Sequence, residues 1–232
     1  MTLDGTNTYV LATAAGNVVV DPGPLLDKHL ESVAALGDVA VVLLTHGHLD
    51  HAESSGRFHE ITGAPTLASD PALCIDGDPL VDGLVVGVPG LEITVLHTPG
   101  HTSDSVCFAV TDGTDRAVLT GDTILGRGTT VVAHPDGALG EYLDSLRRLR
   151  ALGGMLVLPG HGPLRPDVSV AAADYLTHRE ERLAQVKAAL AAGATTPAEV
   201  VEIVYADVDR ALWPAAESSV RAQLDYLSRL PR

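Results

Sequence analysis

Short apolar runs bounded by glycine, proline and aspartate occupy the first two thirds of the chain. Residues 18–20 and 39–44 are continuously apolar, which predicts strands buried on both faces. Residues 91–97 alternate between apolar and polar side chains, which predicts a half-exposed strand. Residues 106–110, 117–119 and 155–158 predict three further short strands.

Helical patterns lie between these runs. Leu26, Leu30 and Val33 follow the i, i+4, i+7 spacing of one helix face, and residues 142–152 predict a second helix. Three basic residues fall on the outer side of that second helix: Arg147, Arg148 and Arg150. The alternation of strands and helices indicates an α/β domain.

From residue 168 onward the pattern predicts helices only. One stripe, ended by a glycine suited to the position after a helix, consists of Leu176, Leu183, Val186, Leu190 and Gly193. A capping box with proline at the first helical position follows at residues 196–199, and a last helix is expected after Pro214, marked by Val220, Leu224 and Leu227. We therefore expect a domain over residues 1–167 and a small helical domain over residues 168–232.

Composition places the protein outside the membrane. No run approaches the roughly 20 apolar residues that span a bilayer, and the first residues show neither the basic nor the apolar part of a signal peptide. Cys107 lies in an apolar run and is expected to be a small buried side chain, so nothing indicates a disulfide framework. We expect a cytoplasmic protein.

The net charge of −15 is unevenly distributed. Residues 1–140 hold 4 basic and 18 acidic side chains, whereas residues 141–232 hold 11 and 12. This balance argues against unspecific affinity for nucleic acid or for an anionic membrane. A polyanionic substrate would have to be attracted by bound metal ions and by arginines of the second part.

The segment Thr45–His51, THGHLDH, is the strongest chemical signal. It places three imidazoles and a carboxylate within six residues, directly after a predicted buried strand. His46 and His48 are separated by one glycine, so both rings can turn toward one cation, and Asp50 and His51 are placed for a second cation. A single histidine after a strand is usually structural, but this density of ligand types is typical of a metal site.

Three later loops repeat the arrangement. His101, Asp122 and His161 each follow a predicted strand in a glycine-containing loop. Functional side chains are commonly presented on loops at the ends of a rigid scaffold. We therefore expect these residues to converge with the first segment.

These residues are those of the metallo-β-lactamase superfamily, which the chain resembles over nearly its whole length. The resemblance implies a four-layer αββα sandwich of α/β class with a winged-helix-like C-terminal appendage. It also implies that His46, His48 and His101 bind one metal and that Asp50, His51 and His161 bind a second, with Asp122 bridging both. A further aspartate, Asp21, matches a position behind the ligands that orients an imidazole; the alternative for Asp21 is an ordinary turn aspartate.

Five imidazoles and two carboxylates without a thiolate suit two Zn²⁺ ions, and manganese or iron could also bind. Two such ions about 3.5–4 Å apart share a water and lower its pKa to around 7, which supplies a bridging hydroxide nucleophile. Asp122 would fix the spacing of the metals and Asp50 could also orient the hydroxide, so both are candidate catalytic residues. Hydrolysis is the predicted reaction class.

The substrate stays open at this point. β-Lactam-hydrolysing members of the superfamily lack the bridging aspartate, and the glycine–cysteine–glycine–arginine segment usual in hydroxyacylglutathione hydrolases is replaced here by residues 124–131, ILGRGTTV. That segment, together with residues 5–9, GTNTY, and residues 142–146, YLDSL, resembles the β-lactamase-like protein 2 branch. Members of this branch usually carry some residues before the GTNTY segment, so a preceding strand is expected of a longer chain.

The branch includes an endoribonuclease and thioesterases. The first hypothesis is therefore a phosphodiesterase or endoribonuclease acting on single-stranded RNA, and the second is an acyl thioesterase or hydroxyacylglutathione-hydrolase-like ester hydrolase. A non-catalytic binding module is the third. We do not expect DNA binding, because Arg221, Arg229 and Arg232 are widely spaced and diluted by acidic residues. The tail is expected beside the active-site mouth or at a homodimer contact.

Overall fold

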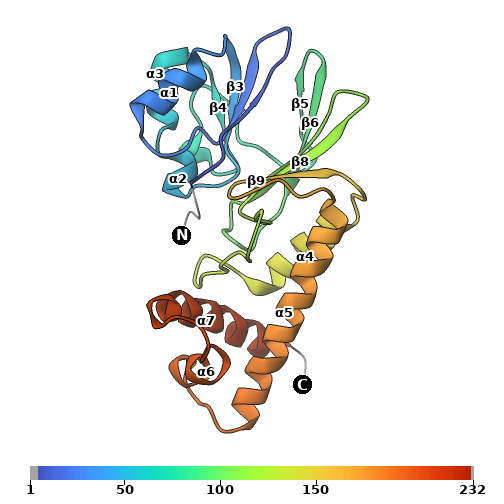
Figure 1. Cartoon of the computed structure of the whole chain (residues 1–232). Helices are drawn as coiled ribbons and strands as arrows, with labels where there is room; N and C mark the ends of the chain where they lie inside the picture. Colours follow the sequence, from blue (N-terminus) through green and yellow to red (C-terminus); the bar gives the residue numbers. More distant parts are fainter. Residues whose placement is uncertain (1–4, 231–232) are drawn as a thin grey trace.

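The computed structural model describes residues 5–230, which form two β-sheets packed face to face with helices on their outer sides (Figure 1). The first sheet has four strands in the order β1 (Tyr9–Leu11), β2 (Asn17–Val20), β3 (Val39–Leu43) and β4 (Thr66–Leu67). The second has five in the order β5 (Val85–Val88), β6 (Leu91–His97), β7 (Val106–Thr111), β8 (Arg116–Gly121) and β9 (Leu156–Pro159).

Most of the ligand-bearing loops leave strands that run in one direction. Strands β2, β3 and β4 pair in parallel, and so do β8 and β9. The remaining pairs are antiparallel, with β1 on the edge of the first sheet and β5, β6 and β7 forming a meander. Parallel strands place their carboxyl ends at one edge of a sheet, where loops can converge.

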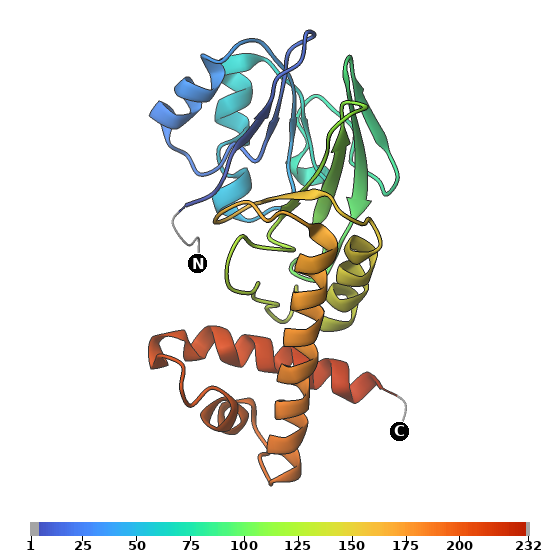
Figure 2. The ribbon, with the colours of Figure 1, turned by 45° about the vertical axis from the view of Figure 1, so that its right-hand side comes forward.

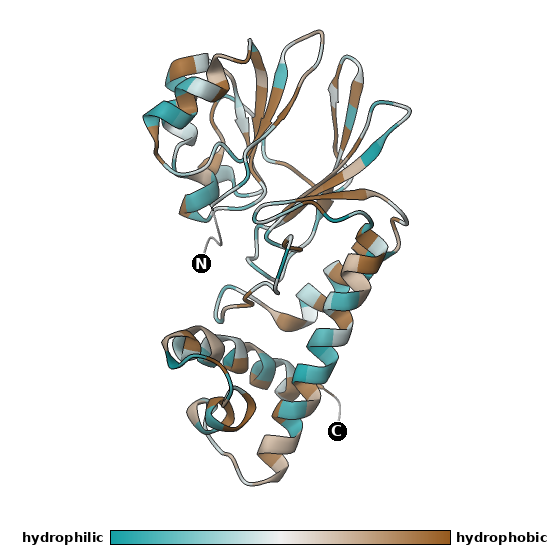
Figure 3. Ribbon diagram, viewed as in Figure 1, coloured by the Kyte–Doolittle hydropathy of each residue, from teal (hydrophilic) through white to brown (hydrophobic). Residues whose placement is uncertain are grey.

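Side-chain alternation along the buried strands separates two apolar layers. On β2, Val18 and Val20 point between the sheets and pack with Val95 and Phe108, whereas Val19 points outward toward Leu30 of the flanking helices. All of these side chains are almost completely buried. Figure 3 shows the same pattern, with apolar residues concentrated on the facing strands. The prediction of strands buried on both faces from continuous valine runs is therefore confirmed.

Helices form the two outer layers. Helices α1 (Asp27–Ala34) and α3 (Ser55–Thr62) cover the first sheet, and the short α2 (Leu49–Ala52) lies at the end of β3. Helix α4 (Leu139–Arg150) and the first half of α5 (Val168–Ala191) cover the second sheet. A short 3₁₀ turn, η1 (Pro71–Leu73), precedes β5. The four-layer αββα sandwich is confirmed.

Helix α5 extends beyond the sandwich into the C-terminal domain (Figure 2). There its second half packs with α6 (Pro197–Val204) and α7 (Trp213–Arg229) around a separate apolar cluster, and the short 3₁₀ turn η2 (Arg210–Leu212) precedes α7. Within residues 168–230 the structure contains helices only, as expected. Helix α7 also reaches back to α4, where a Cβ added at Gly140 would lie 3.3 Å from the ring of Tyr226.

Local signals located most elements, and the differences have physical causes. Strands β1, β4 and β5 and helices α2 and α3 were not predicted, because they are short or weakly apolar. The last helix begins at Trp213, so the expectation that it starts after Pro214 was wrong. Proline fits the first turn of a helix, where its missing N–H has no partner to lose. Thr196 and Glu199 form the predicted capping box.

Within residues 5–230, every helix falls short of the length and apolar character that crossing a bilayer would require.

Leu146 tests the packing of α4 against the second sheet. Its side chain is fully buried, so Leu146→Ala should lower the free energy of unfolding by about 2–5 kcal/mol through lost burial and an unfilled cavity. Leu36→Ala is the matched control, because Leu36 is 65% exposed and its loss should cost less than about 0.5 kcal/mol. Urea unfolding of the metal-free protein measures both. Equal effects would contradict the described packing.

Candidate metal centre

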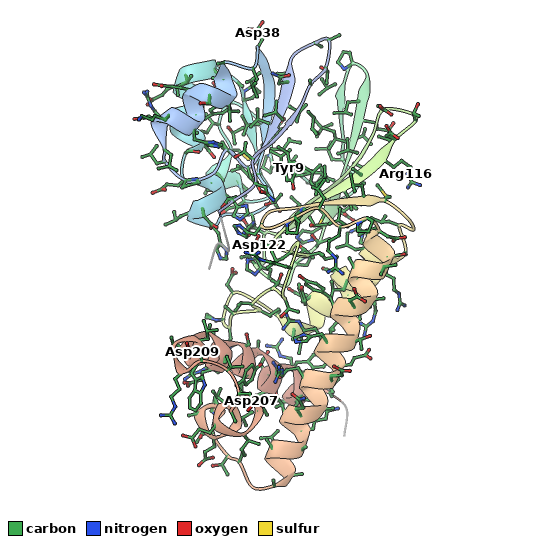
Figure 4. All side chains as sticks on the ribbon, in the orientation of Figure 1. Tyr9, Asp38, Arg116, Asp122, Asp207 and Asp209 are labelled. Carbon is green, nitrogen blue, oxygen red and sulfur yellow. The ribbon has the colours of Figure 1, made fainter. Side chains whose placement is uncertain are left out.

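The predicted ligands converge at one end of the sandwich, facing the C-terminal domain. Figure 4 shows Asp122 at this end and Asp38 at the opposite end of the first sheet. His46 and His48 lie in the loop after β3, whereas Asp50 and His51 lie on α2. The other three follow strands β6, β8 and β9: His101, Asp122 and His161. Residues more than 100 positions apart thus occupy one site.

The side chains form two adjoining groups. In one group the ligand atoms of His46, His48, His101 and Asp122 all lie within 4.8 Å of one another. In the other the same limit holds for Asp50, His51 and His161. The structure therefore brings together all seven candidate ligands, with Asp122 in the first of the two groups.

Nitrogen atoms of neighbouring rings face each other at short range. His48 Nδ1 lies 3.2 Å from His101 Nε2, and His51 Nε2 lies 3.2 Å from His161 Nε2. Two ligand atoms on a tetrahedral Zn²⁺ with bonds of about 2.0–2.1 Å would be separated by roughly 3.3 Å. The spacing of these nitrogens thus matches that of two ligands on one cation.

Asp122 lies between the two groups and presents one oxygen to each. Its Oδ1 lies 3.3 Å from His161 Nε2 and 3.5 Å from His51 Nε2, whereas its Oδ2 lies 3.7 Å from His101 Nε2. Asp50 is confined to one group, where its Oδ2 lies 3.2 Å from His161 Nε2. The two carboxylates therefore occupy different positions relative to the imidazoles.

Hydrogen bonds to the scaffold fix the rings. His101 Nδ1 donates to the carbonyl oxygen of Val131 at 2.7 Å, and His161 Nδ1 donates to that of Gly5 at 2.9 Å. Because a carbonyl oxygen can only accept, each ring carries its proton on Nδ1 and turns Nε2 to the centre. Metal-binding histidines are commonly oriented in this way.

Asp21 orients a third ring from behind the site. Its buried carboxylate accepts hydrogen bonds from the backbone N–H of Thr45 at 2.8 Å and from Thr45 Oγ1 at 2.7 Å. His51 Nδ1 lies 2.8 Å from the same carboxylate, which leaves His51 Nε2 facing the centre. Thr45 Oγ1 also lies 3.0 Å from His46 Nδ1, so it accepts there while it donates to Asp21.

His46 and Asp122 keep buried atoms without hydrogen-bond partners. Within residues 5–230, no hydrogen bond reaches His46 Nε2 or Asp122 Oδ1. An unsatisfied buried polar atom is costly, and here both atoms face the other ligand groups. A Cβ added at Gly160 would lie 2.8 Å from both Asp122 Oδ1 and His51 Cε1, so only glycine leaves room for their present positions. These features fit a site built to hold cations.

The charges inside the site are strongly coupled. Burial alone would lower the pKa of His51, but the carboxylates of Asp21 and Asp122 outweigh it and raise that pKa to about 10. Contact with Asp122 and Asp50 likewise overcomes burial and raises the pKa of His161 to about 9. The close contact of His161 with Asp50 lowers the pKa of that carboxyl to about 2. This side of the site attracts positive charge.

The other side favours neutral rings. Burial, reinforced by the neighbouring imidazoles, lowers the pKa of His46 well below its usual value. Burial also lowers the pKa of His101, although Asp122 opposes the effect. Interactions with His161 and His51 hold the pKa of Asp122 far below its usual range despite burial. Neutral imidazole and ionised carboxylate are the forms that bind metal ions.

Residues 5–7 contact the site from the N-terminal side, and the sequence alone did not predict these contacts. Thr6 Oγ1 lies 3.3 Å from Asp50 Oδ2, and Asn7 Nδ2 donates to the carbonyl oxygens of Pro159 and Gly162 at 2.9 Å. With the bond from His161 to Gly5, residues 5–7 thus hold the loop after β9. No spacing in these short polar residues points to that role; the GTNTY resemblance was their only signal.

A cavity of about 330 Å³ opens onto the ligands. Its polar end contains His48, Asp50, His101 and Asp122. Its wall combines the apolar side chains of Leu125, Val131, Ala133 and Ala215 with the polar ones of Arg127, Thr129 and Thr130. Because Ala215 belongs to α7, the C-terminal domain lies beside the active-site mouth, the first of the two placements expected for it.

A buried arginine of α5 supports the loop that carries Asp122, a second feature that sequence reasoning missed. The guanidinium of Arg179 donates to the carbonyl oxygen of Thr130 and lies 5.1 Å from the ring of Tyr142. Thr130 Oγ1 in turn donates to the carbonyl oxygen of Asp122 at 2.5 Å, and Tyr142 donates to that of Thr123 at 2.7 Å. No motif in the sequence of α5 marks Arg179, so this contact becomes visible only in the folded structure.

Comparison with known proteins supports the same family and the same two-part organisation of the chain. Residues 1–161 match the metallo-beta-lactamase superfamily, and residues 196–230 match the beta-lactamase associated winged helix domain. An atrochrysone carboxyl ACP thioesterase of Aspergillus fumigatus is 34% identical over 88% of this chain and 70% of its own length. The beta-lactamase-like protein 2 homolog of Drosophila melanogaster is 32% identical over 99% of this chain and 84% of its own.

Solved structures of other proteins have the same fold. A metallo-beta-lactamase family protein from Thermus thermophilus superposes with a TM-score of 0.81 and 25% identity, covering 96% of this chain and 88% of that one. Another structure, described as a di-iron-bound form, has a TM-score of 0.59 and 28% identity over 72% of this chain and 92% of its own. The chain therefore belongs to the metallo-β-lactamase superfamily and is a hydrolase of that superfamily with a winged helix domain at its C-terminal end.

Proposed function

We propose that the centre binds two zinc ions. His46, His48 and His101 would hold one ion, Asp50, His51 and His161 would hold the other, and Asp122 would contact both. The unpartnered Nε2 of His46, the 3.2 Å separations between facing nitrogens and the two-sided position of Asp122 support this assignment. Zinc suits a set of imidazoles and carboxylates without thiolate, and iron or manganese is the alternative.

The residues around the ions divide the work of hydrolysis. A bound metal pair supplies Lewis acidity and lowers the pKa of water. Asp122 would fix the spacing of the two halves of the site, and Asp50 would be placed to orient the water that reacts. Asp21 keeps the proton of His51 on Nδ1, so that Nε2 stays available as a ligand.

The division of the chain into two domains between residues 167 and 168 remains a prediction.

We propose that the protein is an acyl thioesterase acting on a small-molecule thioester. The observation that carries this assignment is the 330 Å³ cavity, which joins the ligands to an apolar wall suited to an acyl chain. The similarity to an atrochrysone carboxyl ACP thioesterase also supports this assignment. A net charge of −15 favours a small substrate over a long polyanion.

Hydrolysis of single-stranded RNA is the competing function. The similarity to a beta-lactamase-like protein 2 homolog favours it, because the resemblance of the sequence to that branch led us to expect an endoribonuclease. The acidic first part of the chain counts against it, because contact with phosphates normally relies on basic residues.

Two further expectations remain predictions: that the C-terminal domain does not bind DNA, and that the chain can form a homodimer.

Gly160 tests the geometry of the metal site. Gly160→Ala should lower the affinity for metal about 10- to 100-fold, because the new Cβ displaces Asp122 and His51. Gly56→Ala is the matched control, since Gly56 lies in α3 with open space around it. Competition with a chromogenic chelator measures both affinities. Unchanged affinity in Gly160→Ala would contradict the ligand assignment.

Asp21 tests the orientation of His51. Asp21→Asn keeps the size of the side chain but removes the charge that favours the His51 Nδ1 proton. We expect the second metal to bind about 10- to 100-fold more weakly, while the first is retained. Stoichiometric titration with Co²⁺, followed by its visible absorption, separates the two sites. Two equally tight sites in Asp21→Asn would refute the orienting role.

The substrate class is tested by offering the zinc-loaded protein acyl thioesters and single-stranded RNA in parallel. We expect thioester hydrolysis without RNA cleavage, and loss of activity by at least about 100-fold in Asp122→Asn and His48→Ala, because each change removes a proposed metal ligand. Free thiol and RNA fragments are measured separately. RNA cleavage that survives purification and is lost in both variants, without thioester turnover, would replace the thioesterase proposal by the nuclease.

A further inference from the structure

A second cavity, of about 230 Å³, adjoins the one that opens onto the ligands. Thr129, Thr130, Val131 and Ala215 line both, so the two cavities share one wall. The second cavity lies between the loop after β8 and the C-terminal domain. A substrate whose reacting group lies at the metal ligands could therefore extend into it.

Two arginines of α5 give this cavity a positive side. Arg179 and Arg182 are three residues apart on one helix face, and both line the cavity. Arg182 donates to Gln185 Oε1 and to the carbonyl oxygen of Val204, both at 2.9 Å, and its guanidinium lies 4.3 Å from the ring of Tyr205. These contacts hold the group at the cavity without neutralising it.

Neither guanidinium is paired with a carboxylate among residues 5–230. Arg179, only 6% exposed, donates to a backbone carbonyl, and its Nε has no hydrogen-bond partner in that part of the chain. Six arginines elsewhere have acidic partners, for example Arg165 with Asp174 at 2.6 Å, whereas Arg116, Arg150 and Arg210 have none within residues 5–230. A buried cation without a counter-charge is costly, so this arrangement favours a bound anion.

His178 adds a third nitrogen group beside them. Its Nδ1 is buried and without a partner in the described chain, and the residue lines the same cavity. Burial lowers the pKa of His178, and the positive charges of Arg179 and Arg182 lower it further. In a protein with a net charge of −15, this cavity is thus a local site of positive charge.

We propose that this cavity binds the anionic end of the substrate, a carboxylate or a phosphate, through Arg182 and Arg179. The planar fork of a guanidinium matches the two oxygens of either group. The shared wall, with the side chains of Val131 and Ala215, would then cover the neutral segment between the anion and the thioester. The proposal rests on the proposed thioesterase function for the identity of the reacting group. Binding of the anion can be measured without hydrolysis.

Arg182 is the residue to change, because Arg179 also supports the loop that carries Asp122. Lys187→Gln is the matched control: it removes one positive charge from the same helix at an exposed position outside the cavity. Arg182→Lys keeps the charge but loses the fork. Thermal unfolding shows whether each variant is folded before binding is measured.

Calorimetry on the zinc-loaded full chain compares two anions with neutral analogues. Pantetheine 4′-phosphate is paired with pantetheine, and glutarate is paired with 1,5-pentanediol. We expect one anion to bind at least about tenfold more tightly than its analogue. That preference should be lost in Arg182→Gln, reduced in Arg182→Lys and kept in Lys187→Gln. The anion that shows it identifies the source, the thiol part or the acyl part of the substrate.

The outcomes separate this proposal from the proposed function. A preference absent in the wild-type protein, or one of equal size in Arg182→Gln, overturns the anion site, because binding to zinc alone would not depend on Arg182. A preference that depends on Arg182 supports the site even if no thioester is hydrolysed, in which case the thioesterase assignment alone fails.

Discussion

The orientation of the imidazole rings by the scaffold is the constraint on which the centre depends. His51, His101 and His161 each give one nitrogen to an oxygen of the protein, and His46 does so through Thr45. The second nitrogen of each ring is thereby directed inward. Nε2 of His51 lies 3.2 Å from Nε2 of His161, and Nε2 of His101 lies 3.2 Å from Nδ1 of His48, a separation that suits two ligands of one cation.

That constraint reaches far into the fold. The oxygen that fixes His161 belongs to Gly5, the one that fixes His101 belongs to Val131, and Asp21 connects the ends of β2 and β3 with α2. The loop containing Val131 is itself held by Arg179 of α5, the helix that enters the C-terminal domain. Helix α5 thus contacts the loop that bears Asp122 before it enters the C-terminal domain, and Ala215 of that domain completes the wall of the cavity beside the ligands.

The two cavities give the chain a division between chemistry and recognition. Acidic and imidazole groups gather where metal ions are proposed, whereas two guanidinium groups of α5, neither paired with a carboxylate in the described chain, line the second cavity. The two carboxylates among the candidate ligands, Asp50 and Asp122, lie in the acidic first part of the sequence, whereas Arg179 and Arg182 lie in the nearly balanced second part. Substrates with an anionic end would span both.

The sequence by itself determined the buried strands, the long helices and all seven candidate ligands. Continuous valine runs, the THGHLDH segment and histidine or aspartate after a strand are local patterns with local physical causes. Only the tertiary structure decided the contacts of Gly5, Asn7 and Arg179, because these depend on hydrogen bonds between segments about 50 to 155 residues apart. No periodicity or spacing encodes which carbonyl oxygen a distant side chain meets; packing of the layers settles it.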